Sequence, residues 1–156
     1  MGLYRLRREQ TVPATIDEAW DFISNPGNLK LITPGHMGFD ISGVPPGKMY
    51  PGMIISYTVR PLLGIKMLWV SEITHVREKQ YFVDEQRSGP YKMWHHEHFI
   101  ESVPAGVLMT DIVSYIPPAG FIGNIANSLL IRKELKKIFD YREEALAGIF
   151  NKKGGS

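Results

Sequence analysis

Between residues 37 and 116 the chain consists of short runs of apolar and β-branched residues, separated by breaks mostly rich in glycine and proline. Such runs predict β-strands, and breaks this short predict hairpin connections, so the sheet should be antiparallel. A first strand is expected at 4–12, where polar and apolar residues begin by alternating. The six further strands are expected at 39–44, 53–60, 65–76, 81–87, 92–103 and 107–116.

Two short helices are expected between the first and second strands. The segment that starts at Thr15 has the spacing of a capping box. In that motif the Thr15 hydroxyl accepts from the backbone N–H of Glu18, and the Glu18 carboxylate accepts from the backbone N–H of Thr15. A helix is therefore predicted at about 16–24, and a second at 29–32, before Pro34.

The hydrophobic period changes from two to about 3.6 after residue 118, which predicts one long helix over about 122–150. Its apolar stripe consists of Ile125, Leu129, Leu135, Ile138, Phe139, Leu146 and Ile149. A helix of about 40 Å, at about 1.5 Å per residue, can cover one face of a long sheet. The expected class is α+β: a curved antiparallel sheet of about seven strands around a long C-terminal helix. A cavity arises between the two unless bulky side chains fill it.

Composition narrows the class of protein. The chain of 156 residues is 44% hydrophobic and 22% charged, which is typical of a globular domain. We expect one domain over 1–150 and a flexible tail over 151–156. The net charge of +2 gives no support for nucleic-acid binding. No apolar run predicts a membrane span or a signal peptide. The chain has no cysteine, which excludes disulfides and thiolate sites and is compatible with a cytoplasmic location.

The most informative segment is a predicted hairpin, 81–87 and 92–103, that mixes rings and charges on one face. Because side chains alternate along a strand, every second residue shares that face. Its members are Phe82, Asp84, Gln86, Trp94, His96 and His98. Aromatic rings, a carboxylate and imidazoles together are unusual for a plain core or a solvated surface. They favour the wall of a small-molecule pocket.

A tight turn at 104–106 would set the register of the next hairpin. The opposing pairs would then be His98 with Asp111, His96 with Val113, and Trp94 with Tyr115. The His98–Asp111 pair has two readings. It is either a buried polar pair that fixes the register, or a ligand-facing pair in which the carboxylate makes the imidazole more basic. Asp84 is expected near Trp94 across the other hairpin.

Metal and cofactor chemistry find little support in the sequence. His96 and His98 could chelate an ion, with Asp111 or Asp84 as a third ligand, but a His-x-His pattern alone is weakly specific. No HExxH motif, phosphate-binding loop or nucleophile elbow is present. We therefore expect neither a metal nor a cofactor.

Several segments between residues 61 and 142 match a known family. They are PLLGI (61–65), WVSEI (69–73), FVDEQ (82–86), GPY (89–91), WxHxH (94–98), TDxVxY (110–115) and FxYR (139–142). By these segments the chain resembles the START-like or SRPBCC superfamily, which includes polyketide cyclase/dehydrase and lipid-transfer proteins. More narrowly it resembles a bacterial subgroup of ligand-binding proteins within it. The resemblance implies the helix-grip fold.

Three functions remain open, because this fold supports many activities. The first is a carrier or sensor for a small hydrophobic, amphipathic or lipid-like molecule. The second is a cofactor-free enzyme of the cyclase/dehydrase or hydrolase type that uses His98 and Asp111. The third is an interaction module for an epimerase-like protein, since some members of the subgroup are fused to such a domain. The expected ligand-binding residues are Trp69, Phe82, Asp84, Trp94, His96, His98, Asp111, Tyr115, Leu135 and Ile138.

Three of the candidate residues have alternative roles. Trp69 and Trp94 are either core residues or platforms for a ligand. Arg142, on the C-terminal helix, is either a solvated or ion-paired residue or one that contacts a carboxylate of the pocket.

Overall fold

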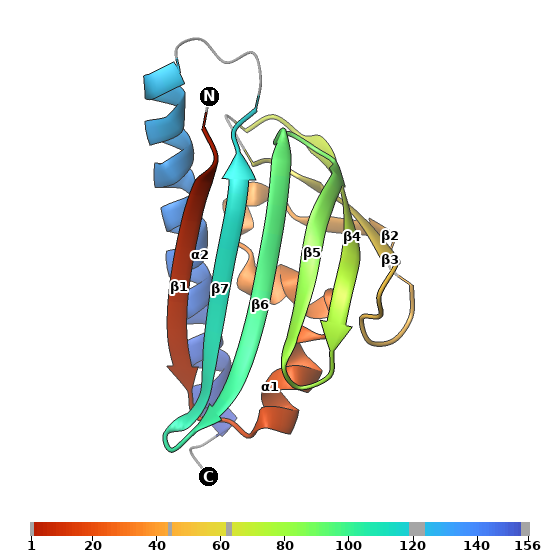
Figure 1. Ribbon diagram of the computed structural model, residues 1–156, viewed down its shortest axis with the longest axis vertical. Helices are drawn as coiled ribbons and strands as arrows, with labels where there is room; N and C mark the ends of the chain where they lie inside the picture. The colour runs from red at the N-terminus through yellow and green to blue at the C-terminus, as the bar shows by residue number, and fades with distance from the viewer. Residues whose placement is uncertain (1, 44, 62–63, 119–123, 154–156) are drawn as a thin grey trace.

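The computed structural model describes residues 2–43, 45–61, 64–118 and 124–153. In these ranges the elements are β1 (Tyr4–Val12), α1 (Ile16–Ile23), η1 (Pro26–Ile32), η2 (Gly35–Met37), β2 (Asp40–Gly43), β3 (Met53–Val59), β4 (Met67–Arg77), β5 (Tyr81–Ser88), β6 (Met93–Val103), β7 (Gly106–Ile116) and α2 (Asn124–Lys153). The described strands form one antiparallel sheet in the order β1-β7-β6-β5-β4-β3-β2. Figure 1 shows the curved sheet with the helices behind it, on one face. The predicted fold class is confirmed.

The two helical segments after β1 follow from local sequence signals. At α1 the backbone N–H of Glu18 donates to Thr15 Oγ1 over 3.2 Å, and the N–H of Thr15 donates to Glu18 Oε2 over 2.9 Å, as the capping box predicts. The second segment is a 3₁₀-helix that begins three residues earlier than expected. Asn25 caps it by accepting from the N–H of Gly27, and Pro26 supplies a helical first position.

The long helix, α2, differs from its predicted range mainly at its ends. The predicted start at residue 122 lies outside the described residues, and so do 154–156 of the expected tail. The helix continues to Lys153, three residues into that tail. None of the helices in the described ranges is both long enough and apolar enough to cross a membrane.

The β6–β7 hairpin has the predicted register, with His98 opposite Asp111. Gly106 in its turn has φ +135°, and a Cβ there would lie 2.1 Å from the carbonyl oxygen of Val12. Only glycine fits that position, so the turn and the register are fixed together.

The β5–β6 hairpin differs from its prediction by one pairing step. Asp84 lies opposite His96 rather than near Trp94. The pairing is symmetric about Pro90, whereas the prediction assumed symmetry about Gly89. Each residue of β5 therefore lies opposite a β6 residue two positions later than expected. The expectation that placed Asp84 beside Trp94 is therefore wrong.

The core between the sheet and the helices has two apolar clusters. The first lies where α1 and the end of α2 cover the sheet, and it includes Trp20, Phe82, Ile100, Leu146 and Phe150. The second lies under the middle of α2 and near η2. Five of its aromatic residues, of which Tyr57 and Trp94 are partly buried, are called here the aromatic cluster: Tyr57, Trp69, Tyr91, Trp94 and Tyr115. Along β6, His96 and His98 lie between these clusters.

Candidate functional site

Three neighbouring strands place titratable side chains at the same level of the sheet's inner face. Asp84 comes from β5, His96 and His98 from β6, and Asp111 from β7. Both imidazoles and the Asp111 carboxylate are buried, with exposed fractions of 5 to 9%. Because residues at i and i+2 of a strand point the same way, these four groups converge between the two apolar clusters.

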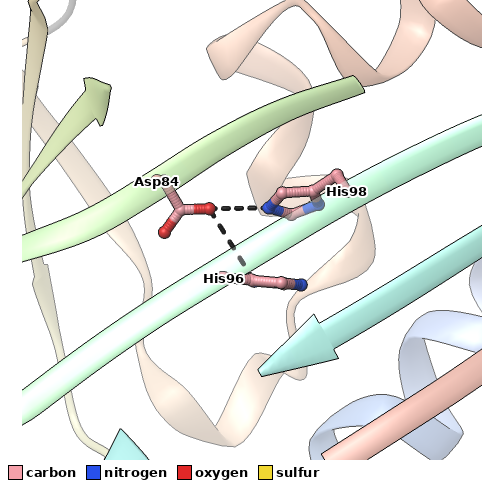
Figure 2. Close-up of side chains that lie close together, drawn as sticks. All are labelled: Asp84, His96 and His98. Carbon is pink, nitrogen blue, oxygen red and sulfur yellow. Dashed lines mark hydrogen bonds and ion pairs between the residues drawn. The ribbon is translucent and has the colours of Figure 1, made fainter. Parts of the chain in front are cut away.

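Each histidine is hydrogen-bonded to the carboxylate diagonal to it rather than to the one directly opposite. His98 Nε2 donates to Asp84 Oδ2 over 2.6 Å (Figure 2), and His96 Nε2 donates to Asp111 Oδ1 over 2.8 Å. His98 Nδ1 lies 3.2 Å from Asp111 Oδ1, but it is not aligned for a hydrogen bond. The expected His98–Asp111 pair is thus an ionic contact. An imidazole's Nε2 is far enough from the backbone to reach a diagonal neighbour.

Ring stacking fixes the planes of the two imidazoles. The rings of His96 and His98 are 3.6 Å apart at 29°. On its other side His98 stacks against Phe82 at 4.0 Å and 14°. The edges of Trp94 and Phe139 flank His96. Neither imidazole can rotate without breaking both a stack and a hydrogen bond.

Arg142 on α2 completes the group. Its Nη2 lies 3.3 Å from Asp111 Oδ1, and its side chain is 12% exposed. The sequence left open whether Arg142 is solvated or contacts a carboxylate, and the structure shows the contact. We call Asp84, His96, His98, Asp111 and Arg142 the polar layer. It contains two carboxylates and one permanent cation, so one protonated imidazole makes it neutral.

The pKa values of the two imidazoles in the polar layer shift in opposite directions, which favours His98 over His96 as the protonated one. Burial by itself raises the pKa of a carboxyl, but Arg142 and the imidazoles outweigh it and hold the pKa of Asp111 well below 3.8. Likewise, His98 and His96 outweigh burial and lower the pKa of Asp84. Burial by itself lowers the pKa of an imidazole, yet the carboxylates on both sides raise the pKa of His98 above 6.5. Burial and the neighbouring His98 lower the pKa of His96.

A pocket of about 150 Å³ lies between this layer, the aromatic cluster and α2. Its lining is largely apolar. Of the expected ligand-binding residues, those that line it are Trp69, Phe82, Asp84, Trp94, His96, His98, Leu135 and Ile138. Asp111 and Tyr115 do not line it. Tyr115 instead stacks on Tyr4 with the ring centres 5.7 Å apart, since β7 is paired with the edge strand β1.

Several lining residues were not among the expected ones. Tyr57 and Ser71 line the pocket from β3 and β4, and Tyr91 from the β5–β6 connection. Trp69 Nε1 donates to Ser71 Oγ over 3.1 Å, and Trp69 stacks on Tyr57 at 6.0 Å. The period of two along β3 and β4 could have placed Tyr57 and Ser71 on the inner face. Tyr91 carries no comparable signal, because it lies in a loop.

The polar layer could offer three metal ligands, since one atom each of Asp84, His96 and His98 lies within 4.8 Å of the others. A metal ion, however, lies in the plane of each imidazole that binds it, along the nitrogen lone pair. Two rings stacked at 3.6 Å and 29° do not direct their lone pairs at one point at a coordinating distance. As placed, the two rings do not fit a shared ion.

Comparison with known proteins identifies the fold. No family model and no curated protein matches the chain. Solved structures do match over nearly the whole chain. The Zhui aromatase/cyclase from Streptomyces sp. R1128 has a TM-score of 0.78 at 11% identity and covers 99% of this chain and 98% of its own. Protein NE0264 from Nitrosomonas europaea has a TM-score of 0.70 at 12% identity, with 97% of both chains covered.

Ara h 8.0201 has a TM-score of 0.61 at 14% identity, and covers 93% of this chain and 98% of its own. The chain therefore has the START-like, helix-grip fold, and the resemblance read from the sequence is confirmed at the level of the fold. At sequence identities of 11–14%, these similarities establish the fold and not a shared function.

Proposed function

We propose that the protein binds a small, largely apolar molecule in the pocket between the sheet and α2. The observation that carries this proposal is an apolar pocket that reaches the buried Asp84, His96 and His98. Ligand sites are usually concave and apolar, with a few polar groups that orient the ligand. The fold supports the proposal in a general way, since one solved structure with the same fold is named as an aromatase/cyclase, an enzyme that must hold a small molecule.

The size of the pocket favours a compact ligand over the lipid-like one expected from the sequence. About 150 Å³ is comparable to cavities that hold a benzene-sized molecule, whereas typical ligand pockets are about 300–1,000 Å³. A long acyl chain would require the pocket to widen. We therefore propose a ligand, or a buried part of one, about the size of a single ring.

A cofactor-free enzyme is the second candidate, and the contacts of His98 favour it. An imidazole whose pKa is raised faces the pocket and is bonded to a carboxylate that also faces it, Asp84. Such a pair can transfer protons to or from a bound substrate. The pair would be His98 with Asp84, rather than the His98 with Asp111 expected from the sequence. The epimerase-like partner and the cytoplasmic location stay predictions.

Native mass spectrometry of the gently purified protein tests the binding proposal. A co-purified small molecule should raise the mass of the wild type. Ile138→Phe should abolish that adduct because it fills the pocket from α2, while Leu68→Phe on the outer face of β4 should keep it. A clean mass from several expression hosts, together with unchanged tryptophan fluorescence across a panel of one-ring compounds, would overturn the proposal.

A further inference from the structure

Two buried hydrogen-bond donors in the pocket wall have no hydrogen-bond partner in the part of the chain that the structure describes. Among the side-chain atoms of the described residues, His98 Nδ1 and Arg142 Nε are both buried and unpaired. Buried polar groups are nearly always hydrogen-bonded, so two exceptions at one place require an explanation. Both residues also contact the same atom, Asp111 Oδ1, at 3.2 Å from His98 Nδ1 and 3.3 Å from Arg142 Nη2.

Both unpaired atoms belong to donors. The Nε of an arginine always carries hydrogen. Nδ1 of His98 lies 3.2 Å from a carboxylate oxygen, whose negative charge favours the protonated form of this nitrogen although the N–H is not directed at it. Nε2 of the same ring already carries a hydrogen, which it donates to Asp84. With a second hydrogen on Nδ1, His98 is positively charged and neutralises the polar layer.

Space for an acceptor adjoins these donors. A second, very small pocket of about 10 Å³ lies between η1 and the inner face of β5 and β6, and its lining includes both His98 and Arg142. It shares Leu29, Ile32 and Phe82 with the main pocket. A volume of this order holds about one oxygen-sized group. A ligand in the main pocket can therefore place a single atom beside both donors.

We propose that this atom is a neutral carbonyl oxygen, which accepts hydrogen bonds from Arg142 Nε and His98 Nδ1. The inference rests on the proposed function, and it adds the chemical class of the ligand: a one-ring apolar molecule that bears a ketone, aldehyde, ester or amide carbonyl. A carbonyl oxygen has two lone pairs and no hydrogen, which matches two donors. A carboxylate would add an unbalanced negative charge to a buried layer that is already neutral.

Three probes of nearly equal size separate these chemistries: acetophenone, ethylbenzene and benzoate. Their binding to the full chain is measured by calorimetry and by quenching of tryptophan fluorescence. We expect acetophenone to bind at least about tenfold more tightly than ethylbenzene, and benzoate to bind most weakly. Equal affinities for acetophenone and ethylbenzene, or tighter binding of benzoate, would overturn the carbonyl assignment while leaving the apolar pocket supported. If no probe binds, the proposed function itself fails.

A matched pair of variants isolates the donor. Arg142→Lys keeps the positive charge beside Asp111 but removes the Nε–H, so one of the two donors is lost and the preference for acetophenone over ethylbenzene should fall severalfold. Arg8→Lys is the control, because Arg8 pairs with Asp140 and Glu143 outside the main pocket. An undiminished preference in Arg142→Lys contradicts the inference.

Infrared spectroscopy gives a readout on the wild type that does not depend on the folding of a variant. The C=O stretch of ¹³C-labelled acetophenone should move to lower wavenumber on binding, relative to the same probe in hexane, because two donors polarise the bond. An unshifted band for the bound probe overturns the inference.

Discussion

The polar layer and the aromatic cluster lie on the same face of the same sheet, yet different interactions hold them. In the aromatic cluster, rings pack against one another: Trp69 meets Trp94 edge-on at 5.3 Å, and Tyr91 lies 4.9 Å from Trp94. In the polar layer, the charge on each group is tolerated only because its neighbours oppose it. Side-chain volume should therefore govern substitutions in the first region, and charge balance should govern them in the second.

The loss of one carboxylate from the polar layer should have the largest effect. Asp111→Ala leaves Arg142 and His98 as buried cations without their shared partner, so the free energy of unfolding should fall by about 3–5 kcal/mol. Urea denaturation at pH 7 measures it. Asp140→Ala, which removes a half-buried carboxylate on α2 that pairs with Arg8 and Lys136, is the control and should change stability by only about 1 kcal/mol. A loss for Asp111→Ala no larger than that of the control would refute the charge-balance account.

A cavity in the aromatic cluster should cost somewhat less. Trp69→Ala removes buried ring contacts and the hydrogen bond to Ser71, and should lower the free energy of unfolding by about 3 kcal/mol. Trp69→Phe should recover more than half of this loss, because volume dominates here. If Trp69→Phe is as unstable as Trp69→Ala, the hydrogen bond matters more than packing, and the contrast between the two regions weakens.

Double-mutant cycles sharpen the comparison. Asp84→Asn and His98→Gln remove the two ends of one hydrogen bond, so their effects on stability should be non-additive by about 2 kcal/mol. Asp111→Ala and Trp69→Ala lie three strands apart, roughly 14 Å at the usual strand spacing, and should add within about 0.5 kcal/mol. A coupling across the regions as large as the one within the polar layer would contradict their separation.

Between pH 5.5 and 8.5 the polar layer, and not the aromatic cluster, should make stability depend on pH, and this is the smallest expected effect. The folded-state pKa of His98 is raised, so its contribution is fully present below pH 6.5 and is lost as pH rises through the folded pKa. The stability advantage of wild type over His98→Gln should therefore shrink above pH 6.5, by at most about 1.4 kcal/mol per pH unit. His96, with its lowered pKa, acts in the opposite sense and loses its contribution below pH 6.5.

Urea denaturation from pH 5.5 to 8.5 measures this trend. The titratable and charged groups that face His98, and so affect its pKa, are Asp84, His96, Asp111 and Arg142. The stability difference between wild type and Trp69→Ala should stay constant over the same range. An advantage over His98→Gln that grows with pH would show that His98 is neutral in the folded protein.

Much of the fold was predictable because it depends on interactions near in sequence. Alternation of side chains identified the strands, and the capping box located the start of α1. The Gly106 turn determined the β6–β7 register, so His98 could be placed opposite Asp111 from the sequence. The same logic failed for Asp84, because a four-residue connection allows more than one centre of pairing.

The sequence by itself thus determined which residues share the inner face of the sheet, since the alternation of side chains along a strand and the length of a tight turn are local properties. Only the tertiary structure decided how those residues are partnered. Each imidazole bonds to a diagonal carboxylate through its Nε2, and Arg142 on α2 contacts Asp111 on β7. Such contacts join groups far apart in the chain, so the polar layer and its two unpaired donors exist only once sheet and helix have come together.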